Sequence, residues 1–134
     1  SIRRKVTQLR DEEKTIVSAW SNTKLNQSIH IDHCIPFAYW PNNDKWNLLP
    51  STEKENLTKS DRVPSKTRMI EARSRILDWW QLAWTSESEK SQFFHEANLS
   101  LPTLSTSVHD FDDVFDAMQF QIYGVKQRLQ INEW

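Results

Sequence analysis

The chain of 134 residues contains a single cysteine, Cys34, and a single glycine, Gly124. One cysteine excludes an internal disulfide and fits a protein of the reducing cytoplasm. It also excludes zinc knuckles built from pairs of cysteines, because such a knuckle needs four ligands. One glycine leaves no glycine-rich loop that could cradle a phosphate, which excludes the nucleotide-binding folds that depend on such loops.

Long apolar runs are also missing. No apolar stretch reaches about 18 residues, so the sequence predicts no membrane span. The first residues, with Arg3, Arg4 and Lys5, lack the apolar run of a signal peptide. Because the sequence begins at Ser1 and not at Met, we expect it to be a piece of a longer protein. Its length and its hydrophobic content of 37% suit one folded domain with one core.

Charge is unevenly distributed, although the net charge is only −1. Residues 1–75 contain 14 Lys and Arg against 9 Asp and Glu, whereas residues 76–134 contain 3 against 9. A basic first half favours a polyanionic substrate. An ordinary solvated surface with an uneven composition explains the same split, and charge alone leaves both interpretations open.

Hydrophobic periodicity predicts a mostly helical chain. Apolar residues spaced three to four apart predict helices over 2–21, about 69–84 and 111–129, and a shorter helix around Phe93 and Phe94. The Ser, Thr and Pro residues within 99–108 predict a loop. At helical spacing, Trp79, Trp80 and Trp84 are expected to belong to the core rather than to stack on bases.

A short hairpin and a helix are predicted in the middle of the first half. Residues 28–35 and 46–49 are typical of short strands, ended by Pro36 and Pro50 because proline has no backbone N–H for a sheet. Thr52 and Glu55 have the spacing of a capping box, which predicts a helix that runs to about residue 60.

This strand–strand–helix segment contains the residue types that a one-metal phosphodiesterase needs. Asp32 offers a carboxylate and Asn56 an amide oxygen, and hard divalent cations prefer oxygen ligands. His33 can take a proton from water near neutral pH. Asn47 can fix the loop through hydrogen bonds to the backbone. Because neighbouring side chains of a strand point to opposite faces, a strand end or bulge must turn Asp32 and His33 to one side.

The ordered set Asp32-His33, Asn47 and Asn56, with the tail Asn56-x-x-Lys59-Ser60-Asp61, resembles the HNH (ββα-metal) nuclease motif in its His-Asn-Asn form. The stretch 30–61 is especially similar to HNH domains of CRISPR effector nucleases, and similar segments occur in restriction and anti-phage nucleases. The resemblance implies an α+β fold that is mostly helical overall. We expect one domain over 1–134, with an N-terminal helical segment 1–27, a ββα-metal core 28–62 containing a two-stranded antiparallel hairpin, and a helical shell 63–134, about four helices surrounding the core.

The resemblance also implies a function. Asp32 and Asn56 are expected to bind Mg²⁺ or Mn²⁺, with His33 as the general base and Asn47 as the brace of the loop. The chain is then an endonuclease that nicks DNA, with RNA not excluded, in defence against foreign DNA. Other domains or subunits of a larger effector complex, and a guide RNA, are the partners implied. Many relatives carry a His where this chain has Asn56, and many carry zinc-binding Cys pairs that are absent here.

Three further residues are candidates for substrate contact. His30 shares a strand face with Asp32 and can contact the phosphate or the ion, or it is a partly buried His satisfied by backbone. Lys59 and Arg62 begin a basic run beside the site, which is otherwise a solvated face. Neither His95 nor His109 has metal-ligand spacing to a partner. The alternative to an enzyme is a non-catalytic module that binds nucleic acid or protein on the same scaffold.

Overall fold

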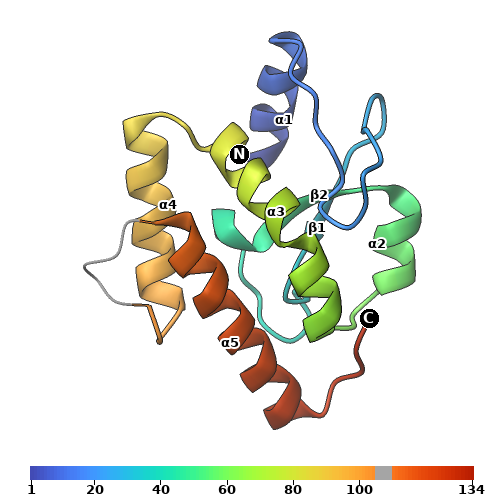
Figure 1. Ribbon diagram of the computed structural model, residues 1–134, viewed down its shortest axis with the longest axis vertical. Helices are drawn as coiled ribbons and strands as arrows, with labels where there is room; N and C mark the ends of the chain where they lie inside the picture. The colour runs from blue at the N-terminus through green and yellow to red at the C-terminus, as the bar shows by residue number, and fades with distance from the viewer. Residues whose placement is uncertain (105–109) are drawn as a thin grey trace.

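The computed structural model describes residues 1–104 and 110–134. A small two-stranded sheet lies in the middle of a helical shell, so the fold is α+β and mostly helical, as the sequence predicts (Figure 1). Residues 105–109, which include the end of the predicted loop and His109, lie outside the described residues. The helices are α1 (Ile2–Asp11), α2 (Glu53–Lys59), α3 (Lys66–Ala83), α4 (Glu87–Ser100) and α5 (Phe111–Leu129).

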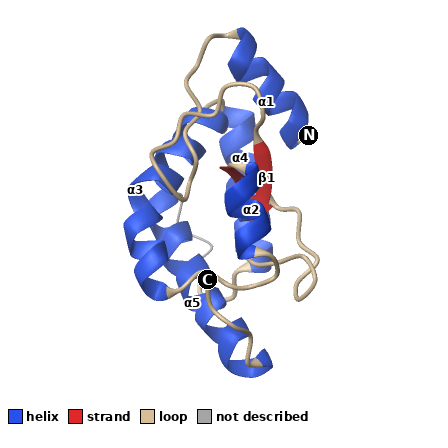
Figure 2. Ribbon diagram, turned by 90° about the vertical axis from the view of Figure 1, so that its right-hand side faces the viewer, coloured by secondary structure: helices blue, strands red, loops and turns tan. Residues whose placement is uncertain are grey.

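The sheet and α2 form the predicted ββα unit. Strand β1 (His30–His33) pairs antiparallel with β2 (Leu48–Ser51), and the short helix α2 packs against β1 (Figure 2). Thr52 caps α2: its hydroxyl accepts from the backbone N–H of Glu55, and the Glu55 carboxylate accepts from the backbone N–H of Thr52. The predicted capping box is therefore confirmed. It sets the start of α2 directly after the hairpin.

The strand boundaries differ from the prediction. The first strand is shorter than 28–35, and a 3-10 turn, η1 (Lys45–Asn47), occupies the first half of the predicted second strand. β2 then continues through Pro50, which lies opposite Ile31. Proline is tolerated there because both strands of a two-stranded sheet are edge strands. The Pro50 carbonyl accepts a hydrogen bond of 2.8 Å from the backbone N–H of Ala19.

The predicted helix over 2–21 is wrong beyond residue 11. Glu13 has a φ of 59°, a left-handed conformation that ends the helical path. The chain then runs extended: Ile16 accepts from the backbone N–H of Leu25 at 2.8 Å, and Val17 forms a bridge with Lys24. The apolar residues of this segment belong to a loop, and their side chains are buried. Their spacing in the sequence happens to match that of a helix.

The remaining helices form the core beside the sheet. α3 and α5 pack on each other, and α5 begins where the Asp110 carboxylate accepts from the N–H of Asp112. α4 extends to Ser100, so the predicted loop begins two residues too early. The predicted core tryptophans Trp79, Trp80 and Trp84 are all buried. No helix in the described ranges is both long and apolar enough to cross a membrane.

The C-terminal residues return to the ββα unit. After α5, Glu133 forms a parallel bridge with Val63, in the connection between α2 and α3. The backbone N–H of Trp134 donates to the Val63 carbonyl at 2.7 Å, and the N–H of Ser65 donates to the Trp134 carbonyl at 2.9 Å. The end of the chain thus lies beside the helix that carries Asn56 (Figure 2).

Candidate active site

An open cleft of about 230 Å³ lies between the end of β1, the loop after it and α2. Asp32 and His33 line it from the strand, and Asn56 lines it from the helix. β1 ends at His33, where the following N–H of Cys34 donates to the Asn47 carbonyl at 2.9 Å. Because regular pairing ends there, two consecutive side chains can face one cleft. The structure therefore brings together three of the four motif residues.

Asp32 is buried, with 3% of its surface exposed, and both of its carboxylate oxygens are bonded. Trp20 donates its indole N–H to Oδ2 at 3.0 Å, and Lys59 donates to Oδ1 at 3.2 Å. Burial raises the pKa of Asp32 above its usual value of 3.8, and the Lys59 ammonium and the Trp20 N–H offset only part of that increase. Since an ionised carboxylate has about four acceptor sites, each oxygen keeps one for a further ligand.

Lys59 occupies a different place from the one predicted. Its side chain is 1% exposed, and its ammonium donates both to Asp32 and to the His33 carbonyl, the latter at 2.8 Å. An ammonium held in this way is not an exposed cation that meets a phosphate. Instead it ties α2 to the end of β1 and supplies the counter-charge of the buried carboxylate.

His33 is half-buried, and its ring orientation is fixed from two sides. Nε2 lies 2.7 Å from the amide oxygen of Asn43, and the Phe37 ring meets the imidazole edge-on at a centroid distance of 5.4 Å. An amide oxygen only accepts, so Nε2 of the neutral ring carries the hydrogen and Nδ1 keeps its lone pair. Asn43 thus selects the tautomer that leaves a basic nitrogen.

Asn47 lies fully buried below the loop. Its Oδ1 accepts from the N–H of Ile35 at 2.8 Å, and its Nδ2 donates to the carbonyls of Ile35 at 3.2 Å and Asn42 at 3.1 Å. These three hydrogen bonds join Asn47 to Ile35 and Asn42, and so fix the loop after β1 at its start and near its end. Such contacts are expected of a residue that fixes the loop. A role of Asn47 in catalysis remains a prediction.

Asn56 is half-buried on the face of α2 that lines the cleft, and none of the described residues bonds its side-chain amide. Within the described ranges no three His, Cys, Asp or Glu side chains gather into a metal site. The motif residues in the cleft offer the Asp32 carboxylate and the Asn56 amide oxygen, which suit a hard cation that takes its other ligands from water and substrate.

The other predicted contact residues lie outside this cleft. His30 is half-buried and pairs with Ser51 in the sheet. Arg62 donates to the carbonyls of Thr58 and Lys59, where a cation suits the end of a helix. Contact of His30 or Arg62 with substrate remains a prediction. The sequence interpretation missed Trp20 and Asn43, because one resembled a helical core residue and the other a turn residue.

Residues 14–65 match the sequence model of a family described as HNH endonuclease. That segment includes Trp20, the hairpin, the loop and α2, and therefore every residue of the cleft discussed above. This segment is similar to the HNH endonuclease family, a class of nucleases, and the family resemblance of the motif is confirmed. The search of curated proteins finds no match to the chain. The helices α3, α4 and α5 lie outside the matched segment.

Proposed function

We propose that the chain is a divalent-metal-dependent endonuclease that hydrolyses phosphodiester bonds of DNA, one strand at a time. The observation that carries the proposal is the meeting of Asp32, His33 and Asn56 in one cleft, with Asn43 leaving the His33 Nδ1 free. An oxygen pair for a cation and an oriented base are what a one-metal phosphodiesterase needs.

Each residue has a distinct part in this proposal. Asp32 and Asn56 hold Mg²⁺ or Mn²⁺, and the bound ion supplies charge neutralisation at the phosphate and the leaving oxygen. His33 accepts at Nδ1 the proton of the attacking water. The Asn43 oxygen then keeps its bond to Nε2–H and stabilises the charged ring. Such a positioned base contributes roughly 10²- to 10⁴-fold in rate.

Cutting of one strand follows if His33 is the base and Asp32 with Asn56 the pair of oxygen ligands, since the described residues bring these three together once. Cutting of both strands needs a second copy or a second nuclease. The basic first half of the chain supports a polyanionic substrate. The likeness of the tail after Asn56 to CRISPR and restriction nucleases supports a place in defence against foreign DNA, with other domains or a guide RNA supplying the target.

A plasmid assay tests the proposed activity. The protein with Mg²⁺ or Mn²⁺ is expected to convert supercoiled plasmid to the nicked form, and EDTA or His33→Ala is expected to abolish the conversion. His95→Ala, a change of an exposed histidine on α4, is the matched control and should leave nicking unchanged. Nicking that persists both in EDTA and in the His33 variant contradicts the one-metal assignment.

One observation favours a second candidate, a non-catalytic binding module. Lys59 already neutralises Asp32 inside the protein, so the carboxylate has a counter-ion without a metal. A titration with Mn²⁺ separates the two functions. A binding module is expected to bind DNA and to show the same Mn²⁺ uptake with and without Asp32→Asn. The nuclease is expected to bind Mn²⁺ and to lose that binding in Asp32→Asn.

A further inference from the structure

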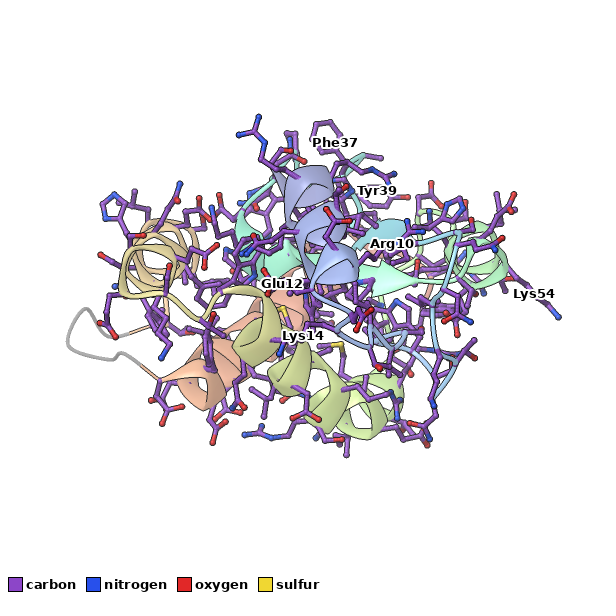
Figure 3. The ribbon with its side chains drawn as sticks, turned by 90° about the horizontal axis from the view of Figure 1, so that it is seen from above. Arg10, Glu12, Lys14, Phe37, Tyr39 and Lys54 are labelled. Atoms are coloured by element: carbon purple, nitrogen blue, oxygen red, sulfur yellow. The ribbon has the colours of Figure 1, made fainter. Side chains whose placement is uncertain are left out.

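Two exposed aromatic side chains stand at the mouth of the cleft. Phe37 is 48% exposed and Tyr39 is 38% exposed, and both belong to the loop between β1 and η1. Phe37 lines the cleft itself and lies against the His33 ring. Figure 3 shows Phe37 at the outer edge of the molecule, with Tyr39 below it on the same side. Any substrate that reaches His33 therefore passes next to an exposed ring.

The backbone of this loop is fixed by hydrogen bonds and by the packing of Trp40. The backbone N–H groups of Tyr39 and Trp40 both donate to the Pro36 carbonyl, at 3.0 and 3.1 Å. Trp40 turns inward, and its ring lies 5.5 Å from that of the buried Trp46. Because the backbone is already fixed, a flat ligand that covers Phe37 need not order the loop, which lowers the entropic cost of binding.

The charge at the rim favours a base over a phosphate. Asp61 also lines the cleft, and its carboxylate accepts from the Tyr39 hydroxyl at 3.2 Å. A carboxylate next to these rings disfavours a phosphate whose charge no metal ion neutralises, and the nearby Lys59 ammonium is buried below the site. Beside this carboxylate the rim exposes the rings of Phe37 and Tyr39, together with the small side chains of Ala38 and Ser60. These suit an uncharged aromatic ligand.

We propose that Phe37, assisted by Tyr39, is a stacking site for an unpaired nucleobase next to the bond that is cut. This inference rests on the proposed function and deepens it. The faces of the bases are covered within a duplex, so only an unstacked base can lie on a protein ring. The substrate class is therefore single-stranded or locally unpaired DNA, in preference to intact duplex.

Binding measured without catalysis tests the site. All variants carry His33→Ala and are studied in EDTA, so that neither cleavage nor a change in the His33 ring affects the result. The anisotropy of a labelled single-stranded oligonucleotide reports affinity. Phe37→Leu is expected to weaken binding roughly tenfold, and Phe37→Trp to preserve it. The control is Phe120→Leu, a change of a ring on α5 that is 61% exposed and lies away from the cleft.

A second ligand separates stacking from other effects. An oligomer of the same length with abasic sites keeps the phosphates and lacks the bases, so Phe37→Leu should leave its binding unchanged. Unchanged affinity of Phe37→Leu for the ordinary single strand overturns the proposal. An equal loss of affinity for the abasic oligomer also overturns it. Tighter binding of duplex than of single strand by the His33→Ala protein overturns it as well. Failure of the proposed nuclease appears separately, as wild-type protein that stacks bases but cuts nothing with Mg²⁺.

Discussion

The indole nitrogen of Trp20 lies 3.0 Å from Oδ2 of Asp32, and this contact joins the N-terminal loop to the end of β1. Trp20 in turn meets the ring of Trp134 edge-on at 5.1 Å, and the Arg68 guanidinium lies 3.8 Å above the Trp134 ring. The orientation of the proposed metal ligand therefore depends on contacts from both ends of the chain, outside the ββα unit.

Trp20→Phe removes the N–H but keeps a ring in the same place. We expect weaker Mn²⁺ binding, because Asp32 is then free to turn, and a loss of about 1–3 kcal/mol in stability from the unsatisfied buried oxygen. Electron paramagnetic resonance titration of Mn²⁺ and urea unfolding measure the two effects. Trp46→Phe is the matched control, since the Trp46 N–H also bonds a carboxylate, that of Asp44, at 3.1 Å. If both variants bind Mn²⁺ like the wild type, Trp20 does not position Asp32.

Lys59→Met leaves Asp32 buried without its counter-charge. Removal of one member of a buried ion pair costs about 3–5 kcal/mol, whereas the double variant Asp32→Asn with Lys59→Met should recover most of that loss. Urea unfolding of the two single variants and the double variant gives the coupling. Additive losses in the double variant would mean that the pair does not act as a unit.

The stability of the Lys59→Met variant should depend on pH. Burial already raises the pKa of Asp32, and loss of the Lys59 ammonium removes the chief opposing influence. A carboxyl whose folded pKa lies above its unfolded pKa loses stability as pH rises above the unfolded value. Relative to wild type, Lys59→Met should therefore be less destabilised near pH 4 than near pH 7. An equal destabilisation at both pH values is the contrary result.

Asn43→Ala should change the rate of cleavage and not the fold. Asn43 is exposed, and its oxygen is the acceptor that holds Nε2–H of His33. Without it the imidazole can rotate and change tautomer, so we expect kcat to fall at least roughly tenfold with unchanged stability. Asn43→Asp keeps the acceptor and should retain activity. Equal kcat values for Asn43→Ala and the wild type would show that Asn43 does not orient the base.

Cys34 should be inert in the folded protein, although it follows the proposed base directly. Complete burial raises the pKa of its thiol to about 12, which leaves almost no thiolate at neutral pH. Iodoacetamide is expected to label Cys34 in urea and not under native conditions, as read by mass spectrometry. Rapid native labelling would place the thiol at the surface.

Local signals carried the prediction of the core motif. The Thr52–Glu55 capping box and the apolar stripe of α5 depend on residues a few positions apart, so the sequence determines them directly. The hairpin and α2 follow from such short-range patterns, and they place Asp32, His33 and Asn56 within reach of one another.

The contacts that were missed join residues far apart in the chain. Trp20 reaches Asp32 across 12 positions, and Lys59 reaches it across 27, from elements whose packing no local pattern specifies. The predicted helix over 2–21 was wrong beyond residue 11, because buried apolar residues of an extended loop have the same spacing as those of a helix. Lys59 was expected at the surface because a lysine is almost never fully buried unless it is paired, and its partner could not be identified from spacing.

Mn²⁺ binding by isothermal titration calorimetry, on the wild type, Asp32→Asn and Asn56→Ala, tests the central claim most directly. One ion per chain is predicted for the wild type, with affinity lost in Asp32→Asn and lowered in Asn56→Ala, and with the same order of the three proteins in plasmid nicking. Binding of Mn²⁺ by Asp32→Asn with wild-type affinity and stoichiometry would contradict it, because the cleft would then not be the metal site.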